Sequence, residues 1–105
     1  MTKAEKLFHQ IAKELPNASE GKAFGVFSIK TPNGKLAVLF WNNKMMFKLD
    51  KKDEEKTLTL KGARKGKHIY DSERSMTGWV QVPFSHSLKW KDLAKKSISY
   101  VMKKK

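Results

Sequence analysis

The first helix is predicted by apolar residues that recur every three or four positions near the N-terminus. They are Ala4, Leu7, Phe8, Ile11, Ala12 and Leu15. At 100° per residue these positions share one helical face. Thr2 and Glu5 form the pattern of a capping box in front of that face. We therefore expect an amphipathic helix that begins after Thr2 and ends at Pro16-Asn17.

Three strand patterns follow, over residues 25–30, 35–41 and 44–49. The first and third alternate apolar with polar side chains, as expected when one face of a sheet is buried. The sequences "TPNG" and "NN" that separate the three segments are suited to tight hairpin turns. The pattern therefore predicts an antiparallel meander.

The middle strand pattern carries apolar residues on both faces. Leu36, Val38 and Phe40 occupy one face, and Ala37, Leu39 and Trp41 occupy the other. Helices at the two ends of the chain leave one face of such a sheet uncovered, and an uncovered apolar face marks a partner site or a dimer seam. We assign this alternative role to Ala37, Leu39 and Trp41, with the opposite set as the second choice.

Residues 50–60, "DKKDEEKTLTL", have two interpretations. The alternation in "TLTL" favours a strand, whereas the acids in the charged preface favour the first turn of a short helix. Residues 61–75 are a polar connection, with a short strand expected around Lys67 to Tyr70. Residues 78–83 predict a closing strand that ends at Pro83, because proline does not donate to a strand ladder.

A second amphipathic helix is predicted from Ser85 or Ser87 onward. Its apolar side contains Trp90, Leu93, Ala94, Ser97, Ile98, Tyr100 and Val101, and its other side contains Lys89, Lys91, Asp92, Lys95, Lys96 and Lys103. This distribution predicts a helix that packs on the core and exposes lysines. Trp79 and Trp90 are expected in the core, whereas Trp41 is the tryptophan most expected to be exposed.

The length and composition indicate one domain over residues 1–105. A chain of this length supports one core, and the 39% apolar content is sufficient to fill it. Cysteine is absent, so disulfides and thiolate chemistry are excluded. No secretory signal or span of roughly 20 apolar residues is visible, so we expect a soluble, cytoplasmic protein without a membrane partner.

The formal net charge of +13 arises from 21 Lys and two Arg against ten acids. A positive field attracts polyanions without reading their sequence. Bidentate recognition of guanine or phosphate depends mainly on Arg, so the scarcity of Arg argues against base reading. A lysine-biased composition explains the charge equally well, and charge alone does not establish nucleic-acid binding.

The motifs of catalysis and metal binding are missing. The segment "GARKGKH" (62–68) resembles a phosphate loop, but its glycines are one residue too close and a histidine follows the lysine. His9, His68 and His86 lack partners at ligand spacing. The acids of "DEE" (53–55) lie among lysines in a segment expected to be solvated. We therefore expect no enzymatic activity, no metal and no cofactor.

The segments "AFGVFSIKTPNGKLAVLFWNNKMMFKL" and "SMTGWVQVP", followed by the last helix, resemble the small bacterial MmcQ/YjbR-like proteins and the related TfoX N-terminal domains. The residues that carry the resemblance are Phe24-Gly25, Gly34-Lys35, Ala37, Lys48-Leu49, Met76, Gly78, Trp79 and Pro83. The resemblance covers nearly the whole chain through the order and spacing of short motifs.

The resemblance implies an α+β fold. It consists of about five strands in an antiparallel meander sheet, helices at both ends and a short helix after the third strand, which favours helix for residues 51–60. YjbR-like proteins are often proposed to bind DNA, and TfoX proteins are linked to competence for DNA uptake. TfoX proteins also carry a C-terminal domain without a counterpart in residues 1–105, so we do not expect a full TfoX-like regulatory role.

The leading functional hypothesis is weak, sequence-nonspecific binding of nucleic acid by a non-enzymatic domain. Its contacts are expected to be Lys89, Lys91, Lys95 and Lys96 of the last helix, helped by Arg64, Lys65 and Lys67 of the polar connection. The alternative is a protein-interaction module or homodimer that uses the outer sheet face.

Overall fold

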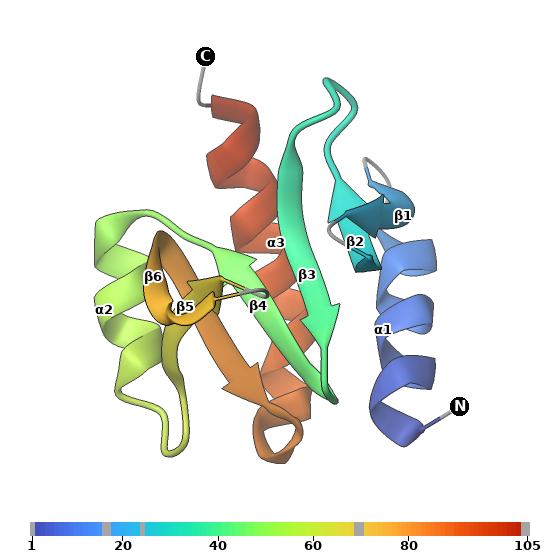
Figure 1. The fold of residues 1–105 in the computed structure, drawn as a ribbon. Helices are drawn as coiled ribbons and strands as arrows, with labels where there is room; N and C mark the ends of the chain where they lie inside the picture. Colours follow the sequence, from blue (N-terminus) through green and yellow to red (C-terminus); the bar gives the residue numbers. More distant parts are fainter. Residues whose placement is uncertain (1, 16–17, 24, 69–70, 104–105) are drawn as a thin grey trace.

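A computed structural model describes residues 2–15, 18–23, 25–68 and 71–103, without the side chains of residues 23, 67–68 and 71–77. Pro16-Asn17, Phe24 and Tyr70 therefore lie outside the described residues. The elements in chain order are α1 (Lys3–Glu14), β1 (Ser19–Ala23), β2 (Val26–Lys30), β3 (Leu36–Trp41), β4 (Lys44–Lys48), α2 (Lys51–Leu58), β5 (Arg64–His68), β6 (Asp71–Pro83), the 3-10 turn η1 (Phe84–His86) and α3 (Ser87–Lys103). The fold class is α+β, as the sequence predicts (Figure 1).

The six strands form one antiparallel sheet in the order β1-β2-β3-β4-β6-β5. The meander expected over β2, β3 and β4 is present, β1 extends it at one edge, and β6 then pairs with β4 and leaves β5 at the other edge. The expectation of about five strands missed β1, whose sequence "SEGKA" lacks the apolar alternation that signals a strand. The short helix α2 follows the strand expected to be third, which β1 makes the fourth.

Side-chain N-caps start both α1, which the sequence predicts, and α2, whose segment has two interpretations in the sequence. The Thr2 hydroxyl accepts a hydrogen bond of 3.1 Å from the Glu5 backbone N–H, as the capping pattern predicts. The Asp50 carboxylate accepts one of 2.8 Å from the Asp53 backbone N–H. Residues 51–58 are therefore helical, and the strand interpretation of "TLTL" is wrong because its first half continues the helix that Asp50 starts.

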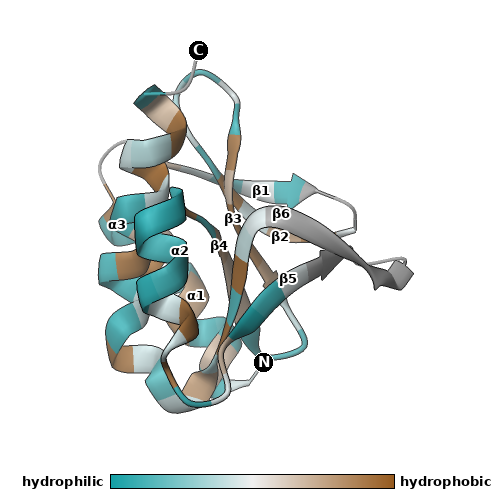
Figure 2. Cartoon of the chain, turned by 90° about the vertical axis from the view of Figure 1, so that its left-hand side faces the viewer, coloured by the Kyte–Doolittle hydropathy of each residue, from teal (hydrophilic) through white to brown (hydrophobic). Residues whose placement is uncertain are grey.

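The main core lies between the sheet and the three helices, which all cover the same face (Figure 2). Phe8 of α1 stacks on Phe40 of β3, with ring centroids 5.4 Å apart. Trp90 of α3 is fully buried, as the helical pattern predicts. The apolar faces of the helices therefore all pack against the same side of the sheet.

A β-bulge changes the direction of Ala37. Ile29 pairs with Val38 and Lys30 pairs with Leu36, so β3 contains one extra residue at this point. Residues at a bulge depart from strict alternation. Ala37 consequently packs in the helix-side core, and its expected place beside Leu39 on the outer face is wrong.

The outer face of the sheet has a small core of its own. It consists of Leu39, Met46 and Trp79, which are all buried, with Val26 and Leu36 packed against them. The hairpin of β5 and β6 lies in front of β4 on the side opposite α3 (Figure 1). The chain therefore closes part of this face with its own hairpin.

An irregular bulge in β6 places Trp79 close to the backbone of β5. Lys65 pairs with Val80 and Lys67 pairs with Ser75, so only Gly66 lies opposite residues 76–79. Gly78 has a φ of 84°, a conformation that favours glycine. A Cβ atom at Gly66 would lie 2.6 Å from the Cβ of Trp79. The segment "SMTGW" therefore has a structural role in closing the outer face.

Replacing Gly66 with alanine is expected to lower the free energy of unfolding by about 1–3 kcal/mol, because the added methyl group overlaps Trp79. Denaturant unfolding followed by tryptophan fluorescence measures the change. Gly21→Ala is the matched control, since no atom lies within 4 Å of a Cβ there. Equal stability of the two variants would contradict the packing of Trp79 on Gly66.

Removal of the α2 cap by Asp50→Ala is expected to cost about 0.5–2 kcal/mol of stability, because the Asp53 N–H loses its acceptor. Asp50→Asn keeps an acceptor at the same position and should retain most of the stability. Thermal unfolding of the three proteins compares them. A loss in Asp50→Asn as large as in Asp50→Ala would show that the hydrogen bond is not the cause.

Candidate nucleic-acid interface

The lysines of α3 divide between two flanks of the helix. Lys89 and Lys96 lie about two turns apart on the flank that faces α2, where the Lys96 Nζ is 4.0 Å from Asp53 Oδ1. Lys91 and Lys95 lie one turn apart on the other flank, where the Lys91 Nζ is 3.4 Å from Glu14 Oε1 of α1. The four lysines expected to act together therefore form two pairs on opposite sides of α3.

The flank beside α2 contains a groove of about 160 Å³. Its lining residues are Lys56, Thr57 and Leu60 of α2 and the following turn, and Lys89, Asp92, Leu93 and Lys96 of α3. Lys56, Lys89 and Lys96 are exposed, so two helices contribute cations to one depression. We name Lys56, Lys89 and Lys96 the groove lysines. The sequence pattern does not indicate Lys56, because it does not show that residues 51–58 lie beside the last helix.

Arg64 and Lys65 are exposed on the edge strand β5. They point to opposite faces, because Lys65 pairs with Val80 of the helix-side core and Arg64 pairs with the next residue, Gln81. Figure 1 shows α2 and β5 toward the same side of the molecule. The side chain of Lys67 lies outside the described part of the chain. Of these residues, Lys65 is on the sheet face that the helices cover.

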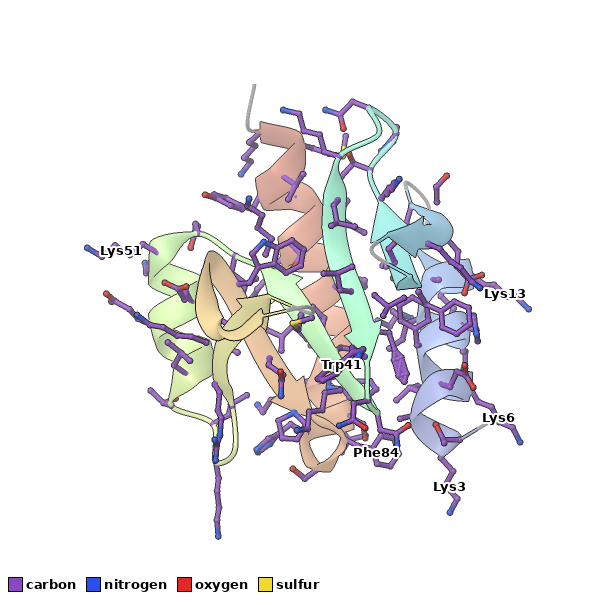
Figure 3. The ribbon with its side chains drawn as sticks, in the orientation of Figure 1. Lys3, Lys6, Lys13, Trp41, Lys51 and Phe84 are labelled. Carbon is purple, nitrogen blue, oxygen red and sulfur yellow. The ribbon has the colours of Figure 1, made fainter. Side chains whose placement is uncertain are left out.

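Lysines also occupy surfaces far from the groove. Lys3, Lys6 and Lys13 project from α1, and Lys51 projects from α2 at the opposite side of the molecule (Figure 3). The ion pairs of Lys91 and Lys96 join exposed groups, which contribute little to stability. The basic charge therefore surrounds the domain, and the groove is a local concentration within it.

The three residues assigned to an outer partner surface differ in exposure. Ala37 and Leu39 are fully buried, whereas the Trp41 side chain is 42% exposed. A cavity of about 330 Å³ lies beside Trp41. The exposed Phe84 and Leu88 were not singled out from the sequence, although both interrupt the polar surface next to Pro83 and the start of α3. Of the three residues assigned to the outer partner surface, Trp41 alone is therefore exposed.

The described histidines make local contacts. His9 contacts the Glu20 carboxylate, and its ring lies edge-on to Phe27. The His86 Nε2 lies 2.6 Å from the Lys61 carbonyl oxygen, to which it donates. Within the ranges that the structure describes, no group of three or more histidine or acidic side chains is arranged to hold a metal ion.

None of the helices in the described ranges has both the length and the apolar character needed to cross a membrane. Comparison of the chain with protein-family models, with curated proteins and with solved structures finds no match.

Proposed function

We propose that this chain is a non-enzymatic, single-domain protein that binds nucleic acid weakly and without strong sequence preference. The observation that carries the proposal is the convergence of Lys56, Lys89 and Lys96 from two helices on one groove. Lysine ammonium groups contact phosphates as point charges, and the release of counterions supplies the affinity. The expected consequence is binding that decreases steeply as the salt concentration rises.

The local acids explain why the proposed binding is weak. Asp53 lies 4.0 Å from Lys96, and Asp92 is part of the groove lining. These carboxylates offset part of the attraction that the groove lysines exert on a phosphate. Lys56 and Lys89 have no acidic side chain within ion-pair distance among the described residues, so these two groove lysines are more available for a phosphate contact than Lys96.

The contribution of β5 is proposed to be secondary. Lys65 extends the basic surface from the groove side, whereas Arg64 points to the other face of the sheet. Because Arg64 points away from the groove lysines, it is not available beside them for bidentate hydrogen bonds to bases. Lysines on an edge strand also prevent edge-to-edge pairing with another sheet, which is a second reason for their presence.

We also propose that the chain is related to the MmcQ/YjbR-like and TfoX N-terminal proteins and acts in the cytoplasm. The support for the relationship is the order of its motifs, of which Gly78 and Trp79 build the bulge that faces Gly66. A regulatory role through DNA agrees with that resemblance and with the basic groove.

Self-association is the second candidate function. The observation that favours it is the 42% exposure of Trp41 on the outer sheet face. With Ala37 and Leu39 covered, a dimer seam would have to be built around Trp41. Sedimentation of the wild type and of Trp41→Lys separates the candidates, because a dimer through this seam should dissociate in the variant.

The double variant Lys56→Ala/Lys89→Ala is expected to bind duplex DNA more weakly and to lower the slope of log affinity against log salt by roughly 2, about one for each lost phosphate contact. Titrations by fluorescence anisotropy at two salt concentrations measure both effects.

The control is Lys13→Ala/Lys30→Ala, which removes the same charge from α1 and β2. An equal loss in the control would indicate that the total charge matters and that the groove does not. Absence of binding by the wild type even at low salt would contradict the proposed function itself.

A further inference from the structure

Exposed apolar side chains occur near one end of the molecule, where Trp41 lies on the outer face of the sheet and Phe84 packs edge-on against Trp90 of the helix-side core. Trp41 is 42% exposed, Phe84 is 39% exposed and Leu88 is 97% exposed. Trp41 pairs with Lys44 across the β3–β4 turn, and Lys44 pairs with Pro83, which directly precedes Phe84. Figure 3 shows Trp41 and Phe84 toward this same end.

Lysines from four parts of the chain belong to segments at this end of the molecule. Lys44 is the first residue of β4 after the turn, and Lys89 follows Leu88. A hydrogen bond of 2.7 Å from the Thr2 hydroxyl to Asn43 Oδ1 brings the start of α1, with Lys3, next to the turn. The bond between His86 and the Lys61 carbonyl brings Lys61 to η1. We name this surface the basic-aromatic end, made up of Lys3, Trp41, Lys44, Lys61, Phe84, Leu88 and Lys89.

The cavity beside Trp41 has aromatic walls and a polar rim. Phe27, Phe40 and Trp41 line it together with the polar residues Thr2, Glu5, Lys22, Asn42 and Asn43. Its volume of about 330 Å³ is within the range of ligand pockets. The Lys22 Nζ lies 5.4 Å from the centroid of the Phe27 ring, so a cation is held over one aromatic wall. A planar, polar-edged group next to an anion matches this arrangement.

We infer that the basic-aromatic end binds single-stranded nucleic acid by stacking an unpaired base on Trp41. This inference rests on the proposed function and names its substrate class. Aromatic platforms flanked by cations bind single strands because every unpaired base has a face free for stacking. The bases of a duplex are already stacked on each other, so Trp41 adds nothing to duplex binding. The proposed phosphate contacts are Lys22, which lines the cavity, and Lys44, which pairs with Trp41.

A membrane surface would use the same apolar and basic side chains. It would make no use of an aromatic-walled cavity whose rim carries the amides of Asn42 and Asn43. These amides offer both donors and acceptors to the edge of a base. The observations therefore favour a nucleobase, and binding of lipid becomes an outcome of the test.

The test measures the affinity of the protein for labelled oligo(dT) and for a duplex of the same length at low salt. Trp41→Leu is expected to weaken single-strand binding about 5- to 150-fold, which corresponds to ~1–3 kcal/mol for one stacked base. Duplex binding should be unchanged. Trp41→Phe, which keeps an aromatic face, should retain most of the single-strand affinity.

Two controls separate stacking from other effects. Met102→Ser removes an exposed apolar side chain that lies near the C-terminal end of α3, outside the basic-aromatic end, and it should leave single-strand binding unchanged. Circular dichroism and thermal unfolding check that Trp41→Leu is folded, which is expected because Trp41 belongs to neither buried cluster.

The outcomes distinguish the two proposals. If neither oligo(dT) nor duplex binds, both proposals fail. If both bind and Trp41→Leu changes neither affinity, the stacking inference fails while the proposed function stands. If Trp41→Leu instead abolishes sedimentation with anionic phosphatidylserine vesicles or lowers the mass of a dimer, and single-strand binding is unchanged, the basic-aromatic end serves another partner and the inference is overturned.

Discussion

The placement of all three helices on one face of the sheet is the constraint on which the rest of the structure depends. A sheet with apolar side chains on both faces must cover the second face with another part of the chain or leave it exposed. Here the close approach of Trp79 to Gly66 holds the β5–β6 hairpin against the outer face, above Leu39 and Met46. The absence of a side chain at Gly66 is what allows that approach.

This closure determines which residues remain for binding. Leu39 is covered, whereas Trp41, two residues further along the same strand, lies beyond the buried cluster and stays exposed. The helices in turn bring their polar flanks together, which places Lys56 of α2 beside Lys89 and Lys96 of α3. The cationic groove and the exposed aromatic residue are therefore both consequences of how the chain covers its sheet.

The sequence predicts those parts of the fold that depend on local periodicity. The two terminal helices, the strands with alternating or continuous apolar residues, and the burial of Trp79 and Trp90 follow from the pattern of single elements. Strand β1 is not predicted, because its residues carry no such pattern. The sheet face that Ala37 occupies is not predicted correctly either, because a bulge depends on the register between two strands. Predicting how the α3 lysines divide between two flanks requires knowing which helix lies on each flank. A helical wheel of α3 alone does not give that information.

The groove lysines and the basic-aromatic end both lie on the surface, outside the two buried clusters. The three tryptophans report on this directly, because Trp41 is exposed at the basic-aromatic end while Trp79 and Trp90 belong to separate cores. The decisive measurement is a titration of ¹⁵N-labelled protein with single-stranded oligonucleotide, followed through the three indole N–H signals in NMR spectra. The account predicts a saturable shift of the Trp41 signal with Trp79 and Trp90 nearly unchanged. A Trp41 signal that stays in place while the other two move, or while backbone signals elsewhere saturate, would contradict it.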